Sequence, residues 1–493
     1  MKNLIRFLVI TGLLIAGLWF FRTWFHGIFV FLYATPVIWY MLLITIILHF
    51  ALFNRSPELK KIGSNAAITV SFFVFVFLLA GGLILAHIAR GLTIAETVEY
   101  QTRESLPEST DSIRLMPYEV AKRYAKDSLQ SSQFKLGTEN IAIIDGKIQW
   151  VFPLTPDGFI LTFNQKNQGI IAVDATTQAK NSKQIRQNLT IGEGMQIVDN
   201  LYWNLYRKNY FVTTDDPMYI PYNNDLYTIV GAIGYRFHFR WGIPFTVPYF
   251  KGVFIVDSAG NIEFVTPEKA LEHPVLTGNR IFPENLTRTY VDAYQYHLGV
   301  LNKFFIHKDQ IQIQDAAGAN SSINRQPYLM NTKEGLKWFI STEPYGASHG
   351  IFKVFIVDAR TGQIEIYQLP PEETLTGPVR AVDYIRRNNP SVDWSMFHSV
   401  EPLPFIRNQK LYWKLTIIPS DAAGIAFQSF IDAETNDVYQ FNNQSTIINF
   451  LTGNTIDQEL ITDQKGTKQD LITEIKQKLK ELESLLEQLT AEE

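Results

Sequence analysis

The sequence predicts an α+β membrane protein with three N-terminal transmembrane helices, an ectodomain of about four repeated helix-plus-antiparallel-sheet units, and a C-terminal amphipathic helix. Three observations lead to this fold class. The first ninety residues hold three long apolar runs, whereas the rest has the composition of a soluble protein. Four stretches of that remainder repeat one strand–turn–strand pattern built on an aspartate. The end of the chain carries leucines at helical spacing.

The composition excludes several kinds of site. At 493 residues the chain is long enough for several domains, and its net charge of −4 gives no basic field that would attract nucleic acid. The absence of cysteine excludes disulfides, thiolate metal sites, iron–sulfur clusters and a cysteine nucleophile. The sequence contains no P-loop, HExxH, GxSxG or dinucleotide-binding fingerprint. We therefore expect no metal, no cofactor and no catalytic residue.

The region 1–90 is predicted to lie in the membrane. Its apolar runs, residues 4–21, 27–52 and 66–89, are each near or above the roughly 20 residues that cross a bilayer as a helix. Pro36 is expected to kink the second helix, and the Gly81-Gly82 pair in the third permits close helix packing.

Basic residues in the short loops predict the orientation. Lys2 and Arg6 precede the first run, and Arg55, Lys60 and Lys61 separate the second from the third. The positive-inside rule places both segments in the cytoplasm. Three crossings of the cytoplasmic (inner) membrane would then leave everything after about residue 90 extracytoplasmic, beginning with a linker at 91–116.

The repeated hairpin is clearest at residues 354–369, VFIVDARTGQIEIYQL, where β-branched and aromatic residues flank a glycine-containing turn. Looser copies occupy residues 169–178, 252–265 and 429–441. Each copy has an aspartate at its turn, expected to accept hydrogen bonds from the turn amides: Asp174, Asp257, Asp358 and Asp432. A calcium site would need several clustered oxygens, and no such loop is present.

A tryptophan precedes each of these aspartates, which supports the repeat. The four are Trp150, Trp241, Trp338 and Trp413. We expect each to lie in a strand and anchor a helix to its sheet, with ligand stacking as the alternative.

Four units follow from this pattern: 117–185, 186–275, 276–375 and 376–445. Each opens with a predicted helix: 118–129, 195–206, 286–298 and 379–387. The first unit is also expected to contain a strand at 159–163. A linker at 446–468 would follow the last unit.

Residues 469–493 are predicted to form an amphipathic helix that resembles a short coiled coil. Its apolar stripe is Leu471, Ile475, Leu479, Leu482, Leu485 and Leu489. Such a helix could pair with a copy of itself, dock on the ectodomain, or grip a partner helix, so we expect a protein partner or self-association.

Two further segments could bind a ligand. Residues 343–350 contain Glu343, Tyr345, Ser348 and His349, in either a glycine-rich hairpin or a binding loop. Asp215 and Asp216 belong to an aromatic insertion that forms either a contact surface or a segment packed on a neighbouring unit.

The histidines of the membrane region offer a redox alternative. His26, His49 and His87 lie near the expected helix ends, and bound haem would need paired axial histidines. Polar residues are, however, ordinary at helix ends.

A helix followed by strands and a VDAxTGxI hairpin resembles PepSY-type domains. The closest match is IVDARTGQI at 356–364, followed by IDAETNDV with the Trp413 strand in the fourth unit. The resemblance implies small α+β modules of bacterial envelope and secreted proteins, associated with modulating peptidases and carrying no catalytic residues of their own.

The expected function is therefore that of a non-enzymatic, membrane-anchored, extracytoplasmic interaction protein that modulates a peptidase or scaffolds an envelope complex. Its environment would be the lipid bilayer, with no nucleic acid. The alternatives are a haem-binding redox protein or another enzyme whose site is assembled from distant residues, and a channel or transporter subunit.

Overall fold

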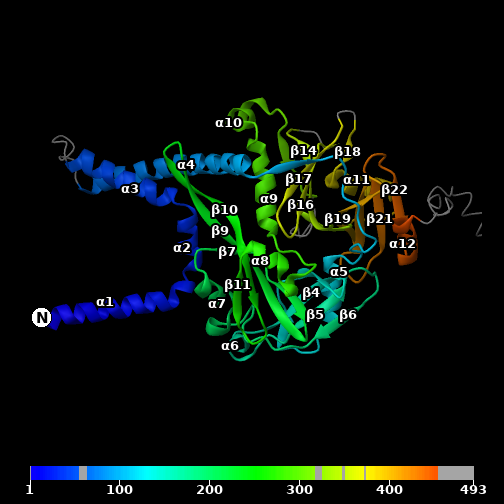
Figure 1. Cartoon of the computed structure of the whole chain (residues 1–493), viewed down its shortest axis with the longest axis horizontal. Coiled ribbons are helices and arrows are strands. Elements are labelled where there is room, and N and C mark those ends of the chain that lie inside the picture. Colours follow the sequence, from blue (N-terminus) through cyan, green and yellow to red (C-terminus); the bar gives the residue numbers. More distant parts are fainter. Residues whose placement is uncertain (1, 55–63, 317–324, 347–349, 371–372, 454–493) are drawn as a thin grey trace, which may run out of the picture.

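The computed structural model describes residues 2–54, 64–316, 325–346, 350–370 and 373–453. It is a mixed α+β protein with apolar N-terminal helices and four main sheets (Figure 1). The helices of the N-terminal region are α1 (Lys2–Phe20), α2 (His26–Ala34), α3 (Val37–His49) and α4 (Ser64–Thr97).

Among the helices in the described ranges, only α4 is by itself long and apolar enough to cross a membrane. The pair α1–α2 passes the same test only as one broken span, bent by 82°. The predicted second span is wrong as a single helix, because it divides at Pro36 into α2 and the shorter α3. Proline lacks an N–H and disfavours helical geometry in the preceding residue, here Thr35 with φ −125° and ψ 63°. The described residues thus support one or two spans rather than three.

Helix α4 continues beyond the predicted end of its apolar run to Thr97, so the first part of the expected linker is helical. Nε of Arg90 donates to the carbonyl of Thr246 at 2.7 Å. A Cβ on Gly91 would lie 2.3 Å from the ring of Tyr296, which shows how closely α4 packs there. The helix is therefore joined to the sheet domains by direct packing.

The first two sheets are antiparallel and each follows a helix. After α5 (Tyr118–Asp127) come β2 (Phe134–Leu136), β3 (Asn140–Ile144), β4 (Lys147–Pro156), α6 (Leu161–Asn164), β5 (Ile170–Asp174) and β6 (Ser182–Ile185). After α7 (Leu201–Lys208) come β7 (Thr213–Thr214), β8 (Met218–Tyr222), β9 (Asp225–Arg240), β10 (Ile243–Val256), β11 (Ile262–Val265) and α8 (Pro267–Glu272).

The other two main sheets repeat the order of helix, then hairpins. After α9 (Glu284–Ala293) and α10 (Gly299–Leu301) come β12 (Ile311–Ile313), β13 (Tyr328–Thr332), β14 (Gly335–Pro344), β15 (Gly350–Ile351), β16 (Lys353–Asp358), β17 (Ile364–Gln368) and β18 (Leu375–Thr376). After α11 (Pro378–Asn388) come β19 (Phe397–Arg407), β20 (Lys410–Pro419), β21 (Phe427–Asp432), β22 (Val438–Phe441) and α12 (Gln444–Thr452).

In each of the four sheets, the segment that precedes the helix is hydrogen-bonded to the turn that contains the aspartate. The carbonyl of the residue after each turn aspartate accepts a backbone N–H from this segment in all four sheets. The pairs are Leu115 and Met116 to Ala175, Thr190 to Ser258, Ile281 and Phe282 to Ala359, and Thr376 to Ala433. This shared bond fixes where each helix starts relative to its sheet.

The strand register places three of the four tryptophans alike. Trp150 faces Val173, Trp338 faces Val357 and Trp413 faces Ile431, in each case the residue before the turn aspartate. All three are at most 4% exposed.

Trp241 does not fit, and its predicted position in a strand is wrong. It lies in the turn between β9 and β10 with φ +51° and 51% of its surface exposed. Thr228 takes the place opposite Val256 instead. The hairpin is so long that its tip lies far from the sheet core.

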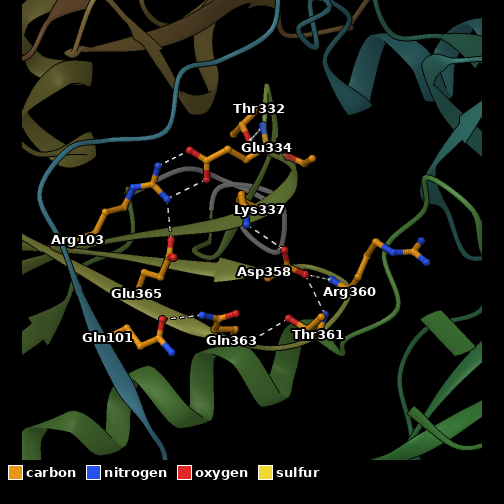
Figure 2. A network of polar contacts seen from close by, with 11 residues as sticks. Gln101, Arg103, Thr332, Glu334, Lys337, Asp358, Arg360, Thr361, Gln363 and Glu365 are labelled. Atoms are coloured by element: carbon orange, nitrogen blue, oxygen red, sulfur yellow. Dashed lines mark hydrogen bonds and ion pairs between the residues drawn. The ribbon is translucent and has the colours of Figure 1, made fainter. Parts of the chain in front are cut away.

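The chain between α4 and α5 is ordered along the third sheet. Strand β1 (Tyr100–Arg103) pairs in parallel with β17. Arg103 pairs with Glu334 and, at 2.7 Å, with Glu365, while Lys337 binds Asp358 at 2.9 Å (Figure 2). Residues 100–103 are therefore a sheet edge rather than part of a free linker.

Two other predicted segments differ in the structure. The strand expected at 159–163 is replaced by the short helix α6, preceded by Phe159 and Ile160, which are 79% and 70% exposed. Helix α12 occupies the start of the linker expected at 446–468, with Phe450 packed in a small aromatic core. The predicted helix at 469–493, including its stripe from Leu471 to Leu489, lies outside the described residues.

Candidate functional site: a polar cavity between three sheets

Two helix-leading segments carry the same short pattern, an arginine three residues before a proline. They are residues 114–117, RLMP, and 280–283, RIFP. Both are fixed by the backbone bonds to Ala175 and Ala359 described above. Arg114 and Arg280 therefore occupy matching positions beside the first and third sheets.

Each arginine lies over the buried tryptophan of its own sheet. The guanidinium of Arg114 is 5.2 Å from the ring centre of Trp150, and that of Arg280 is 5.7 Å from that of Trp338. Such stacking holds a planar cation against an aromatic face. Both pairs line one cavity.

Buried carboxylates neutralise both arginines. Arg114 Nε lies 3.2 Å from Glu401, which is 1% exposed, and Arg280 lies 3.3 Å from Asp215, which is 8% exposed. The charges of both guanidinium groups are thus paired within the protein.

The cavity has a volume of about 180 Å³ and draws its lining from the first, second and third sheets and their flanking segments. Its polar lining, besides the two arginines, comprises Glu139, Asn140, Asp216, Glu284 and Arg325. Ile141, Leu329 and the two tryptophans supply apolar surface. A cleft that combines an apolar wall with a few polar groups is the usual form of a ligand site.

Two deeply buried polar groups on this lining have neither a hydrogen bond nor an ion pair among the described residues, unlike Arg114 Nε, which has no hydrogen bond but is paired with Glu401. They are the side-chain amide of Asn140, 4% exposed, and the indole N–H of Trp338, 3% exposed. By contrast, Trp150 Nε1 donates to Met116 O at 2.9 Å and Trp413 Nε1 to Thr376 O at 2.7 Å. An unsatisfied buried group costs about 1–3 kcal/mol. Water or a ligand in the cavity could satisfy both groups.

The acidic residues on the lining repel one another. Burial, together with the charges of Asp215 and Asp216, raises the pKa of Glu284 to about 7 although Arg280 and Arg325 oppose the shift. Partial burial and Asp215 also raise the pKa of Asp216, whose side chain reaches solvent. Around the cavity, the carboxylates of Glu139, Asp215, Asp216, Glu284 and Glu401 outnumber its three guanidinium groups. A bound cation would relieve this repulsion.

A buried lysine holds the backbone of Arg114 in place. The ammonium of Lys414, a residue 1% exposed, donates to the carbonyl of Arg114 at 2.7 Å. Burial lowers the pKa of Lys414 to about 7, while the charge of Glu401 acts in the opposite direction. Gln428 binds the next carbonyl, that of Leu115, at 2.5 Å. These bonds position Arg114 and so shape the cavity.

The structure brings some predicted residues to the cavity and leaves others away from it. Trp150, Trp338 and Asp216 line it, and Asp215 lies directly behind Arg280. Trp413 is buried against the helix-leading segment of the fourth sheet.

The turn aspartates lie at the ends of their strands, where they accept local hydrogen bonds. Asp174 accepts the N–H of Thr176, Asp257 that of Asn261, Asp358 those of Arg360 and Thr361, and Asp432 those of Glu434 and Thr435. Burial opposes ionisation of Asp358, but Lys337 and the turn amides together hold its pKa below the usual value.

The predicted loop at 343–350 is not a single exposed loop. Glu343 lies within β14 opposite Gln312 and is 2% exposed, because β14 is longer than the local pattern indicates. Tyr345 is exposed and stacks on His307 at 4.3 Å. Ser348 and His349 lie outside the described residues.

Of the three membrane-region histidines, His87 is exposed, and His26 and His49 form contacts within the protein. His26 Nε2 bonds the carbonyls of Tyr210 and Val212 at 2.9 and 3.0 Å, and its ring stacks on Tyr206 at 3.4 Å. His49 Nδ1 bonds the hydroxyl of Ser71 at 2.7 Å. The first set of contacts docks α2 on the second sheet domain.

Sequence reasoning missed the residues that define the cavity. Arg114, Arg280 and Asn140, which line it, and Lys414, which holds the carbonyl of Arg114, come from different parts of the chain and carry no familiar motif. One available signal was the arginine three residues before the proline at two predicted helix starts.

No protein-family model and no curated protein matches this sequence.

Proposed function

We propose that this chain is a membrane-anchored, extracytoplasmic interaction protein whose ectodomain is built from four PepSY-like units. The cavity between three of these units would bind a positively charged group of its partner, such as a lysine or arginine side chain or a free amine. Modulation of a peptidase, or scaffolding of an envelope complex, would follow from holding such a segment.

The observation that carries the binding proposal is the unpartnered Asn140 amide on a cavity lining with surplus carboxylates. An amide can accept a hydrogen bond from an ammonium or guanidinium group. Asp216 and Glu284 supply negative charge, and neither has an ion pair within the described chain. The two tryptophans offer apolar surface for the methylene stem of such a side chain.

Three features support the membrane anchoring. Helix α4 is apolar over its span with only 6% of that window buried in the protein. It runs directly into packing contacts with the sheet domains, including Arg90 to Thr246. The basic residues at the start of α1 and between α3 and α4 favour a cytoplasmic N-terminus. We further propose that three segments cross the membrane and that residues 469–493 form the helix that grips a partner or a second copy.

The binding proposal is tested with small probes on the purified full-length protein in detergent. We expect Nα-acetyl-lysine amide or Nα-acetyl-arginine amide to raise the melting temperature, and Nα-acetyl-norleucine amide to have no effect. Glu284→Gln should weaken the response about tenfold or more, because a bound cation favours the ionised form of Glu284 and glutamine cannot ionise. Glu268→Gln, at an exposed glutamate of α8, is the matched control. An equal response to norleucine amide, or unchanged binding by Glu284→Gln, would contradict the proposal.

A separate experiment tests the proposed orientation in the membrane. Because the chain has no cysteine, a single engineered thiol reports the accessibility of one position. Ser395→Cys, in an exposed turn of the ectodomain, should react with an impermeant maleimide in intact spheroplasts. Lys2→Cys should react only after the membrane is opened. The reverse pattern would overturn the proposed orientation.

A further inference from the structure

The β9–β10 hairpin extends far beyond the sheet to which it belongs. The strands have 16 and 14 residues, yet β7 and β8 pair with β9 only as far as Ile233, and β11 pairs with β10 only from Val253. The outer half is therefore two-stranded. A two-stranded hairpin is at best marginally stable in water without another surface. Something else must support this half.

One face of the outer half packs on the N-terminal helices. Ile243, Phe245 and Val247 are buried in a cluster that includes residues of α3 and α4. Arg240, from the same face, pairs with Glu96 near the end of α4 at 2.8 Å. The hairpin is thus fixed to the helix best suited to cross a membrane, and Figure 1 shows its tip alongside α4.

The opposite face and the turn expose large aromatic side chains. Phe237, Phe239 and Trp241 are 55%, 65% and 51% exposed. The ring of Phe237 lies 4.9 Å from that of Tyr33 in α2, and the ring of Phe239 lies 6.2 Å from that of Tyr40 in α3. Phe237 and Phe239 therefore continue the apolar surface of the helices, and Trp241 follows them in the turn. Exposed apolar groups gathered in this way mark an interaction site.

We propose that the hairpin tip, residues 237–241, inserts its aromatic side chains into the headgroup region of the lipid bilayer beside α3 and α4. Tryptophan and other amphipathic rings favour this depth of a membrane. Arg240 lies over the Trp241 ring at 5.2 Å while its guanidinium reaches Glu96, so the charge can stay on the ectodomain side as the ring enters the interface. The tip would be a second point of attachment that fixes the tilt of the ectodomain.

This inference rests on the proposed membrane anchoring, and the experiment separates the two. The full-length protein carrying Phe239→Cys is labelled with a nitrobenzoxadiazole dye and reconstituted into nanodiscs of phosphatidylcholine and phosphatidylglycerol. Co-elution with the nanodisc tests anchoring. Phe159→Cys is the control, since Phe159 is a phenylalanine that is 79% exposed, against 65% for Phe239, and lies outside the cluster that packs on α3 and α4.

We expect dye at position 239 to show blue-shifted emission and quenching by doxyl-labelled lipids, and dye at 159 to show neither. Protein that co-elutes with nanodiscs but leaves position 239 unquenched would overturn the hairpin proposal alone. Equal quenching at both positions would overturn it as well, because the whole ectodomain face would then lie on the membrane. Failure to co-elute would refute the anchoring on which it rests.

Discussion

The three buried tryptophans provide a graded test of how the helices are held on their sheets. Replacing each with phenylalanine removes the indole N–H and leaves an aromatic ring in the core. Trp150 and Trp413 donate to the carbonyl just before a helix, at 2.9 and 2.7 Å. Trp338 is equally buried, but its N–H has no acceptor among the described residues. The substitutions therefore share the loss of volume and differ in the hydrogen bond.

The expected magnitude follows from that difference. Every Trp→Phe change costs free energy through the smaller ring and the space left behind. Trp150→Phe and Trp413→Phe additionally leave a buried carbonyl unsatisfied, at about 1–3 kcal/mol. Trp338→Phe removes an unsatisfied donor instead. We expect Trp338→Phe to be the mildest of the three by at least about 1 kcal/mol.

Hydrogen exchange read by mass spectrometry on the full-length protein measures this effect locally. The amides of Leu115 and Met116 report the first sheet, those of Ile281 and Phe282 the third, and that of Thr376 the fourth. We expect faster exchange in the segment belonging to each substituted tryptophan, most weakly for Trp338→Phe. Equal acceleration in all three, or the largest effect for Trp338→Phe, would refute the role assigned to the indole hydrogen bonds.

Three other predictions concern packing and charge. Trp241→Ala should change the free energy of unfolding by less than about 0.5 kcal/mol, whereas Trp413→Ala should cost about 3–5 kcal/mol in urea titrations. Gly82→Ala should lower the free energy of unfolding in detergent by about 1–3 kcal/mol, because the added Cβ would lie 2.7 Å from a methionine side chain of α3. Gly81→Ala should be neutral, because an added Cβ there would meet no described atom within 4 Å. The pKa of Lys414 falls from 10.5 to about 7 on folding, so between these pH values the unfolded chain binds a proton that the folded protein does not. The free energy of unfolding should therefore rise with pH across this window, and Lys414→Met should flatten the rise. Equal losses for either matched pair, or an unchanged pH profile for Lys414→Met, would contradict these expectations.

Local patterns predicted the elements whose determinants lie close together in the chain. The hairpin at 354–369 was readable because β-branched residues flank a turn containing Asp358 and Gly362, which adopts φ +80°. Trp241 was misplaced because its local context resembles that of the other tryptophans. The register of β9 and β10 shows instead that Thr228 lies opposite Val256, far from Trp241 along β9.

In the membrane region, too, the sequence does not reveal features that depend on contacts between distant residues. Hydropathy located the apolar runs, but not the 82° bend that turns α2 across the ends of α1 and α3, as Figure 1 shows. At that bend His26 contacts Tyr206 and two carbonyls of the second sheet domain, residues nearly two hundred positions away in the sequence. The cavity was out of reach for the same reason, since Arg114, Asp216 and Arg280 meet only in the fold.

The most direct test of the interaction proposal is photo-crosslinking from the cavity in living cells. A photoreactive amino acid replaces Arg325, which lines the cavity and is exposed, or Lys183, which is exposed on β6 away from it. We expect position 325 to capture a defined envelope protein, identified by mass spectrometry, that position 183 does not capture and that Glu284→Gln releases. Identical capture from both positions, or capture unaffected by Glu284→Gln, would contradict the claim that this protein holds its partner through the cavity.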